Sequence, residues 1–559
     1  MGNRFSYLFR KFFIFRFFVF LLIFCGLAAF ILYLSSLTSK YPLINKITPP
    51  IASAGEEIII EGSYFGDEID SSWIEIGDAI IQAENCSIWT DTKIVFKYPE
   101  YQNGGIVYVA VQNKKSQPSF MASVSSIPLI KEKAHSGGIP SIIALDKDFA
   151  EVGSIIKISG ENFGETRGSS QVLFVSDFNS SMIEQVEKKE DIEAARCSDY
   201  DYDFVLWSNE ELHVRVPDGA DSGMLLVVTA SGASNSVPFR VKNKIGTKTY
   251  SNKKNFAVAA EVDISNVEAA EKNSLFIKVP LPIQSYSQRD VKVLSILPAP
   301  FVADYQGASI HQYENVNSST KIHIRQEYGL NTYEVNTRIN PVNVRVNSRQ
   351  NKAIYDNYAI ATELIPSNDP VIQKTASEIV QNEKNPYNKA RRIYNYLLKN
   401  VDIIPASILN SGSLPVNALI EKKADTYDIA ILFAALARAA GIPAQPIAGI
   451  ITDVSQTVYL HWWAEFYLEG FGWVPVDLGL AKSVPFDMGV SQSENWYFGN
   501  LDAFRVAFSR GENIQSPMAS NSTMVSKERS YAFYNGWEEF SGLTKYNSVW
   551  RTPNIIAIY

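Results

Sequence analysis

Cysteine is scarce in this sequence, with three residues among 559. Cys25 lies in an apolar run near the N-terminus, whereas Cys86 and Cys197 fall at different points of two repeated segments described below. This arrangement is not that of a disulfide framework or a zinc cluster. The five histidines are scattered singly along the chain. We therefore expect no metal site and no cofactor.

A basic tract is also missing outside the extreme N-terminus. The sequence has 51 lysines and arginines against 59 aspartates and glutamates, which gives a formal net charge of −8. Nucleic-acid binding requires a basic surface. The composition therefore argues against a nucleic-acid partner.

Charge is absent from one long stretch, FFVFLLIFCGLAAFILYLSSL at residues 17–37. This stretch is long enough to span a bilayer, and four basic residues precede it, which predicts a cytoplasmic tail at 1–16 and a transmembrane helix at 17–37. The bulk of the chain would then be extracytoplasmic, either periplasmic or on the cell surface. A cleaved signal peptide remains the alternative, although the apolar run is longer than is usual in such peptides.

Two segments of the chain repeat. One begins at Pro42 with PLINKITPPIASAGEEIIIEGSYFGD, and the other at Pro140 with PSIIALDKDFAEVGSIIKISGENFGE. Further on, WTDTKIVFKYP matches WSNEELHVRVP, with a wider spacing in the second copy that indicates an insertion including EQVEKKEDIEAARCSDYDYD. Short alternating strands broken by glycine turns predict two small β-sandwiches. Residues 42–122 and 138–242 resemble IPT/TIG immunoglobulin-like domains, which implies spacers or binding modules.

The remaining chain changes character twice. Residues 250–355 alternate without helical spacing, which predicts a further all-β domain of unknown role. Helical patterns follow, and we assign 356–500 to an α+β domain and 501–559 to its C-terminal extension. In one of the predicted helices Asn385 provides the cap and Pro386 the first residue. A chain of 559 residues is expected to divide into several such domains.

The stretch KKADTYDIAILFAALARAAGIPAQ, residues 422–445, predicts a buried helix. Apolar residues recur at helical spacing and alanines fill the gaps, while Gly441 before Pro443 ends the helix. Asp425 or Thr426 can cap the free N–H groups of the first turn, so the helix is expected to begin at about Thr426.

A hairpin is predicted beyond this helix, in TVYLHWWAEFYLEGFGWVPVDLGL at residues 457–480. His461, Trp463 and Glu465 alternate along one strand and share a face. The EGFG turn returns the chain, so His461 and Asp477 become cross-strand neighbours. A carboxylate that orients an imidazole toward a helix N-terminus provides two members of a nucleophilic triad.

These residues resemble the transglutaminase-like superfamily, over roughly residues 385–480. The family has a cysteine followed at two and four residues by Asp and Ala, then GIPA, His-x-Trp-x-Glu, and Gly-Trp with a later Asp. The matching pieces here are TYDIA, GIPA, HWWAE and GWVPVD. The resemblance implies a papain-like fold, with His461 and Asp477 in the catalytic His and Asp places and Trp463 and Trp473 near the substrate pocket.

Thr426 stands where the family has its cysteine. A thiol begins near a pKa of ~8.5 and falls further at a helix N-terminus, whereas a hydroxyl ionises far above neutral pH. Known threonine nucleophiles use their own N-terminal amine, but Thr426 is internal. We therefore favour a capping, non-catalytic Thr426 over a nucleophilic one.

Several neighbouring residues have two interpretations. His461 is either a packed strand residue or the remnant of an active site, and the longer pattern favours the second. Trp463 and Trp473 either pack in the core or line a groove for an extended peptide or glycan. Arg505 and Arg510 are either surface charges or ligand-binding residues.

Three hypotheses for function follow. The leading one is a membrane-anchored extracytoplasmic protein with an inactive transglutaminase-like domain that binds an envelope protein or peptide or acts as a scaffold in a bacterial cell envelope. The second is a hydrolase or acyltransferase with a triad of Thr426, His461 and Asp477. The third is an adhesive surface protein that binds through its repeats.

Overall fold

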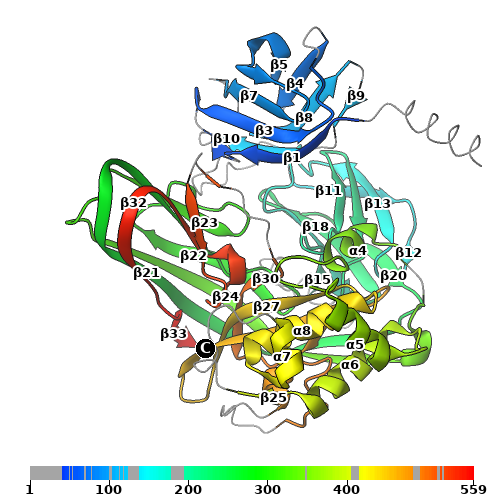
Figure 1. The fold of residues 1–559 in the computed structure, drawn as a ribbon. Coiled ribbons are helices and arrows are strands. Elements are labelled where there is room, and N and C mark those ends of the chain that lie inside the picture. Colours follow the sequence, from blue (N-terminus) through cyan, green and yellow to red (C-terminus); the bar gives the residue numbers. More distant parts are fainter. Residues whose placement is uncertain are drawn as a thin grey trace, which may run out of the picture. The chain divides into compact units, whose positions relative to one another are not determined.

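The computed structural model (Figure 1) describes residues 41–558, with gaps at 50, 53, 68–70, 77–78, 100–103, 113, 117–118, 124–137, 178–193, 347–348, 405–414, 483–491, 513–516 and 519–521. The predicted tail at 1–16 and transmembrane helix at 17–37 lie outside the described residues. In the part that is described, no helix has the length and apolar character needed to cross a membrane. The chain divides into two compact units, one of residues 1–127 with 516–520 and the other of 128–515 with 521–559.

The first repeat, in the first unit, is a two-sheet β structure. One sheet has the order β1-β3-β7-β6 and the other β2-β10-β8-β4-β5, with β9 beside β8. Two motifs that recur in both repeats contact each other here: the Trp89 indole donates to the Phe65 carbonyl at 3.1 Å. A Cβ on Gly62 would stand 2.0 Å from the Leu43 carbonyl oxygen, so only glycine fits there. The strands are β1 Leu43–Thr48, β2 Ile51–Ala52, β3 Glu57–Ser63, β4 Ser72–Ile76, β5 Ala79–Gln82, β6 Ile88–Trp89, β7 Lys93–Lys97, β8 Gly104–Val111, β9 Lys114–Lys115 and β10 Ser119–Ser123.

The second repeat has the same strand order, β11-β13-β17-β16 in one sheet and β12-β20-β18-β14-β15 in the other, with β19 beside β18. Its Trp207 indole donates to the Gly164 carbonyl at 3.1 Å, and a Cβ on Gly160 would stand 2.1 Å from the Ser141 carbonyl oxygen. The sequence repeat therefore reflects one structural motif used twice. The strands are β11 Ser141–Leu145, β12 Phe149–Ala150, β13 Ile155–Glu161, β14 Gln171–Ser176, β15 Ala195–Arg196, β16 Phe204–Trp207, β17 Glu211–Arg215, β18 Gly223–Thr229, β19 Gly232–Ala233 and β20 Val237–Val241.

The all-β domain is built around one long strand, β21 (Gly246–Pro280), which pairs with β24 (Ile322–Ile339). The C-terminal segment returns to this strand: β32 (Trp537–Trp550) and β33 (Asn554–Ile558) both pair with β21. Figure 1 shows β32 in red beside green β21. The sheet also contains β22 Gln288–Leu297, β23 Ala308–Glu314 and β31 Thr523–Ser526.

This pairing corrects the expectation that 501–559 forms one extension of the preceding domain. Of the described strands in 501–559, β30 (Arg505–Arg510) joins the sheet of that domain, as the edge of β29-β28-β27-β30. The strands from Thr523 onward belong to the β21 sheet. The partner of β32 and β33 is β21, which lies far away in the sequence, so no local pattern could indicate this pairing.

The helical region packs its helices on the four-stranded sheet. Helix α8 (Thr426–Ala439) is buried along nearly its whole length and contacts β28 (Val458–Leu468) and β27 (Ala444–Thr452). As predicted, Asn385 caps α6 (Pro386–Asn400) and Pro386 is its first residue. The other elements are α4 Lys352–Tyr358, α5 Pro370–Val380, α7 Pro415–Glu421, α9 Leu478–Ala481, β25 Asp402–Ile403, β26 Lys423–Ala424 and β29 Gly472–Val476.

Candidate active site

The N-terminus of α8 is capped by Asp425, whose Oδ1 accepts from the Asp428 N–H at 2.8 Å. Thr426 is the first helical residue, as predicted, and of the two candidate caps the structure selects Asp425, which corrects the favoured capping role of Thr426. Among the described residues, the Thr426 hydroxyl has no hydrogen-bond partner, and Thr426 is 9% exposed. The helix therefore does not depend on this hydroxyl for its stability.

Arg529 closes the first turn of α8 from the C-terminal segment. Its guanidinium donates to Asp425 at 2.7 Å and to Asp428 at 2.9 Å, and it lies 4.3 Å from the Tyr427 ring centroid. Burial and the neighbouring Asp425 raise the pKa of Asp428 to about 6, against the opposing effect of Arg529. This carboxyl group therefore titrates well above the range of an exposed aspartate.

Replacing Asp428 with asparagine is expected to reduce the pH dependence of stability. Because the pKa of Asp428 is raised in the folded protein to about 6, the folded state binds more protons than the unfolded chain between pH of about 4 and 6. The free energy of unfolding therefore falls as pH rises through that window. Asp428→Asn should gain stability relative to wild type from pH 4 to pH 7 in urea unfolding followed by tryptophan fluorescence. Asp356→Asn, at an exposed site on α4, is the control. If the difference in free energy of unfolding between Asp428→Asn and wild type did not change with pH, this prediction would be contradicted.

His461 and Asp477 lie side by side as the hairpin predicted, with His461 Nε2 and Asp477 Oδ2 2.7 Å apart. Both are buried, at 1% and 0% exposure. Asp477 follows β29, and its Oδ1 caps α9 by accepting from the Leu480 N–H at 2.9 Å. The Nε2 contact leaves Nδ1 of the imidazole as the atom available to act as a base.

Arg505 shares the same carboxylate oxygen. Its Nη1 donates to Asp477 Oδ2 at 2.9 Å, and its Nη2 pairs with Asp502. Burial alone would raise the pKa of Asp477, but His461, Arg505 and the Leu480 N–H together hold it below its usual range. The sequence left open whether Arg505 was an ordinary surface charge; it is buried in the site because β30 pairs with β27.

Gly479 is where the three predicted triad residues meet. A Cβ at this position would stand 2.7 Å from Thr426 Cγ2, 3.1 Å from His461 Cε1 and 3.4 Å from Asp477 Oδ1. Glycine therefore permits the N-terminus of α8 to approach the imidazole. No sequence argument singled out this residue, although its place two residues after Asp477 was visible.

Replacing Gly479 with alanine is expected to destabilise the protein by about 1–3 kcal/mol, because the added methyl group overpacks the site. Shortening the side chain that it meets, in the double variant Gly479→Ala/Thr426→Ser, should recover part of this loss. Gly329→Ala is the matched control, since its Cβ would make only ordinary contact with Leu294 at 3.6 Å. Urea unfolding measures all three. An equal cost in the single and double variants would contradict the assigned contact.

The two tryptophans have different places. Trp463 stacks on His461, with ring centroids 6.1 Å apart, and Arg505 lies 4.9 Å from its ring. Trp473 is fully buried, and its indole donates to Asp201 of the second repeat at 2.7 Å. Trp463 therefore lies against His461, while Trp473 belongs to the packing between this domain and the second repeat.

Arg510 lies in that same packing. It donates to Glu465 through Nε and to Asp201 at 3.0 Å through Nη1, and it stacks on Trp473 at 4.7 Å. Its side chain is 1% exposed. The structure excludes a surface role for Arg510 and gives it a structural one, which the sequence could not reveal because Asp201 is in another domain.

Comparisons with known proteins agree with the motifs. A model of the transglutaminase-like superfamily matches residues 373–478, which contain α8, His461 and Asp477. Residues 373–478 are a transglutaminase-like domain. A model of the IPT/TIG domain matches residues 42–126, the first repeat.

Individual relatives of the chain are remote. An uncharacterized protein of Haemophilus influenzae is 32% identical over 178 residues, and the match covers 26% of this chain and 48% of the relative, about half its length. A solved structure of a putative cysteine protease from Cytophaga hutchinsonii is 16% identical, with 56% of this chain and 93% of that chain covered and a TM-score of 0.37. The periplasmic domain of TgpA from Pseudomonas aeruginosa is 13% identical, with 40% and 87% covered and a TM-score of 0.22.

The transglutaminase-like domain thus presents an imidazole and its carboxylate at the N-terminus of a buried helix. A thiol in place of Thr426 would complete a nucleophilic triad. With threonine there, the arrangement retains the base and its orienting group but offers a hydroxyl to them.

Proposed function

We propose that the protein is a membrane-anchored, extracytoplasmic protein whose transglutaminase-like domain, of papain-like fold, binds a peptide or protein of the cell envelope without turnover. The anchor is the apolar segment at 17–37, and the two repeats act as spacers between it and the rest of the chain. The proposal rests on one observation, the surroundings of Thr426.

The carboxylate that contacts His461 is shared with Arg505. Asp477 Oδ2 lies 2.7 Å from His461 Nε2 and accepts from Arg505 Nη1 at 2.9 Å, so the negative charge of this carboxylate is paired with a guanidinium. A threonine hydroxyl ionises far above neutral pH and requires a strong base. A neutral hydroxyl in the place of a thiol supports binding over acyl transfer.

The rival is an active hydrolase or acyltransferase that uses Thr426, His461 and Asp477. The observation in its favour is the intact His461–Asp477 contact of 2.7 Å. Such a pair also persists for structural reasons here, because Asp477 caps α9 and holds Arg505. The contact is therefore expected in an inactive domain as well.

Turnover by three forms of the full-length protein tests the proposal. Wild type, Thr426→Ala and Thr426→Cys are assayed for amine incorporation into a glutamine-containing peptide and for ammonia release, with proteolysis followed in parallel. We expect wild type to be as inactive as the alanine form and the cysteine form to gain activity. Activity in wild type that the alanine form lacks would establish Thr426 as a nucleophile and overturn the proposal.

The adhesive alternative is tested by deletion. If a partner isolated on the full-length protein also binds after residues 250–559 are removed, the repeats carry the binding. Loss of binding in that deletion, with the repeats still folded by circular dichroism, supports the transglutaminase-like domain as the binding part.

A further inference from the structure

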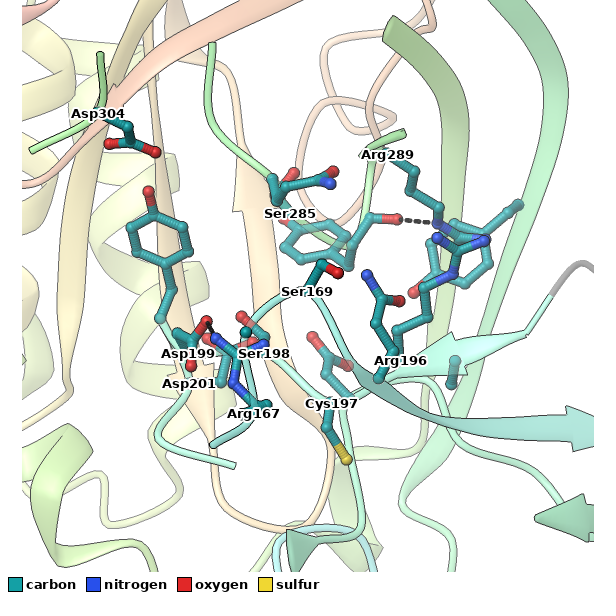
Figure 2. A pocket seen from close by; sticks show the side chains of 18 residues that line it. Arg167, Ser169, Arg196, Cys197, Ser198, Asp199, Asp201, Ser285, Arg289 and Asp304 are labelled. Atoms are coloured by element: carbon teal, nitrogen blue, oxygen red, sulfur yellow. Dashed lines mark hydrogen bonds and ion pairs between the residues drawn. The ribbon is translucent and has the colours of Figure 1, made fainter. Parts of the chain in front are cut away.

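A cavity of about 400 Å³ lies between the second repeat and the β domain, within the second compact unit. Its walls include the loop before β14, β15 and the loop after it, and the start of β22 (Figure 2). None of the three triad positions lines this cavity. A second cavity of about 560 Å³ shares Ser169, Gln171, Arg196 and Gln284 with it.

Most charges around this cavity are paired within the protein. Arg167 pairs with Asp199, and Arg196 pairs with Asp290 at 2.8 Å. The walls also contain Asp201, which pairs with Arg510 at 3.0 Å, and Asp218, which pairs with Lys248 at 2.5 Å. Each of these side chains thus has a partner within the protein, and the pairs leave little net charge at the walls of the cavity.

Arg289 is an exception. It is 4% exposed, and its Nε donates to the Tyr286 carbonyl at 3.1 Å. Its guanidinium is held between two tyrosine rings, 4.3 Å from the Tyr250 centroid and 4.6 Å from that of Tyr333. Among the described residues no carboxylate lies within ion-pair distance of it. A buried, flat and rigidly held guanidinium without a carboxylate is a suitable anchor for an anion.

An unsatisfied acceptor lies near Arg289. Asp218 Oδ1 is buried and has no hydrogen-bond partner in the described structure, although Oδ2 of the same carboxylate is bonded to Lys248. Tyr250 is close to both residues: burial and Asp218 raise its pKa, and Arg289 opposes this. The cavity thus has a guanidinium without a carboxylate partner and an unsatisfied acceptor at its walls.

The ordinary explanation is structural. Two aromatic faces offset part of the cost of burying Arg289, and Lys248 offsets the charge of Asp218. That explanation accounts for both charges, but it leaves Arg289 without a carboxylate and Asp218 Oδ1 without a hydrogen bond at the wall of a cavity of ligand size.

We propose that this cavity binds a small hydroxylated carboxylate of the uronic acid class, with its carboxylate on Arg289 and a hydroxyl donating to Asp218 Oδ1. A hydroxyl fits Asp218 better than an amine, because an amine would add a second cation beside Lys248. The rings of Tyr200 and Tyr286, which also line the cavity, provide flat surfaces for a pyranose. Ser285 adds a hydroxyl to the same wall.

Calorimetric titration of the full-length protein with three probes tests the proposal. D-glucuronate has the carboxylate, the ring and the hydroxyls; D-glucose lacks the carboxylate, and acetate lacks the ring. We expect saturable binding of glucuronate, weaker binding of acetate, and no binding of glucose. Arg289→Gln should weaken glucuronate binding roughly tenfold to hundredfold, because a charge-assisted bidentate contact is lost.

Two variants complete the design. Arg325→Gln removes a guanidinium outside the cavity, which pairs with Glu261 and Glu327, and should bind glucuronate as wild type does. Arg289→Lys keeps the charge but not the planar fork, and it should bind more weakly than wild type; it decides the matter if Arg289→Gln does not fold. Absence of glucuronate binding to wild type, equal binding of glucose, or unchanged binding by the Arg289 variants would overturn the proposal.

Discussion

Replacing Arg510 with methionine is expected to destabilise the second unit by about 3–5 kcal/mol, because two buried carboxylates lose their counter-charge. Arg510 is the common partner of Glu465 and Asp201, and its side chain is 1% exposed. Glu465 would keep the Gln445 amide and the Tyr286 hydroxyl as donors, but neither carries a positive charge. Methionine fills similar space to arginine, so the destabilisation comes mainly from the loss of the positive charge.

Urea unfolding followed by tryptophan fluorescence measures this effect. Arg551→Met is the control, since Arg551 pairs with Asp263 on an exposed surface and its loss should cost less than about 1 kcal/mol. Adding Glu465→Gln to Arg510→Met should recover stability, because one unpaired charge is removed. Equal costs for the Arg510 and Arg551 variants would contradict a buried structural role.

Replacing Thr426 with cysteine is expected to create a thiol whose pKa lies below ~8.5, because it stands at a helix N-terminus beside His461. The two cysteines among the described residues should react slowly: burial raises the pKa of Cys86 to about 11 and that of Cys197 well above its ordinary value. At neutral pH the introduced thiol should therefore react with iodoacetamide faster than the native cysteines by roughly an order of magnitude or more.

The pH dependence of the alkylation rate measures the thiol pKa. Adding His461→Ala to Thr426→Cys should raise that pKa and slow the reaction at pH 7, since the imidazole no longer stabilises the thiolate. Wild type alkylated in parallel gives the background. A midpoint at or above that of a free cysteine would show that the helix N-terminus and His461 do not form a nucleophile site.

Local patterns predicted the parts of the site that lie close together in the sequence. The hairpin turn between β28 and β29 brings the ends of the two strands together, so the approach of His461 to Asp477 followed from the turn and the alternation. The apolar period predicted α8, and the same pattern allowed either Asp425 or Thr426 as the cap. The structure selects Asp425, whose carboxylate also holds Arg529.

Long-range pairing was beyond the sequence. Arg505 and Arg510 gave no sign of burial, because their partners depend on β30 joining β27 and on the second repeat docking against Trp473. The pairing of β32 with β21 joins strands that are separated in the sequence by most of the second unit. The continuity of β21 over Gly246–Pro280 was likewise hidden, since its alternating pieces suggested separate strands.

The most direct test of the account is a search for a covalent intermediate on Thr426. Full-length wild type, Thr426→Ala and Thr426→Cys are each mixed with a glutamine-containing peptide without an acceptor amine, quenched in acid and examined by intact-mass and peptide-mapping mass spectrometry. We expect no acyl adduct on wild type or on the alanine form, and an adduct on the cysteine form. An adduct on Thr426 of wild type that the alanine form lacks would contradict it and establish an active threonine enzyme.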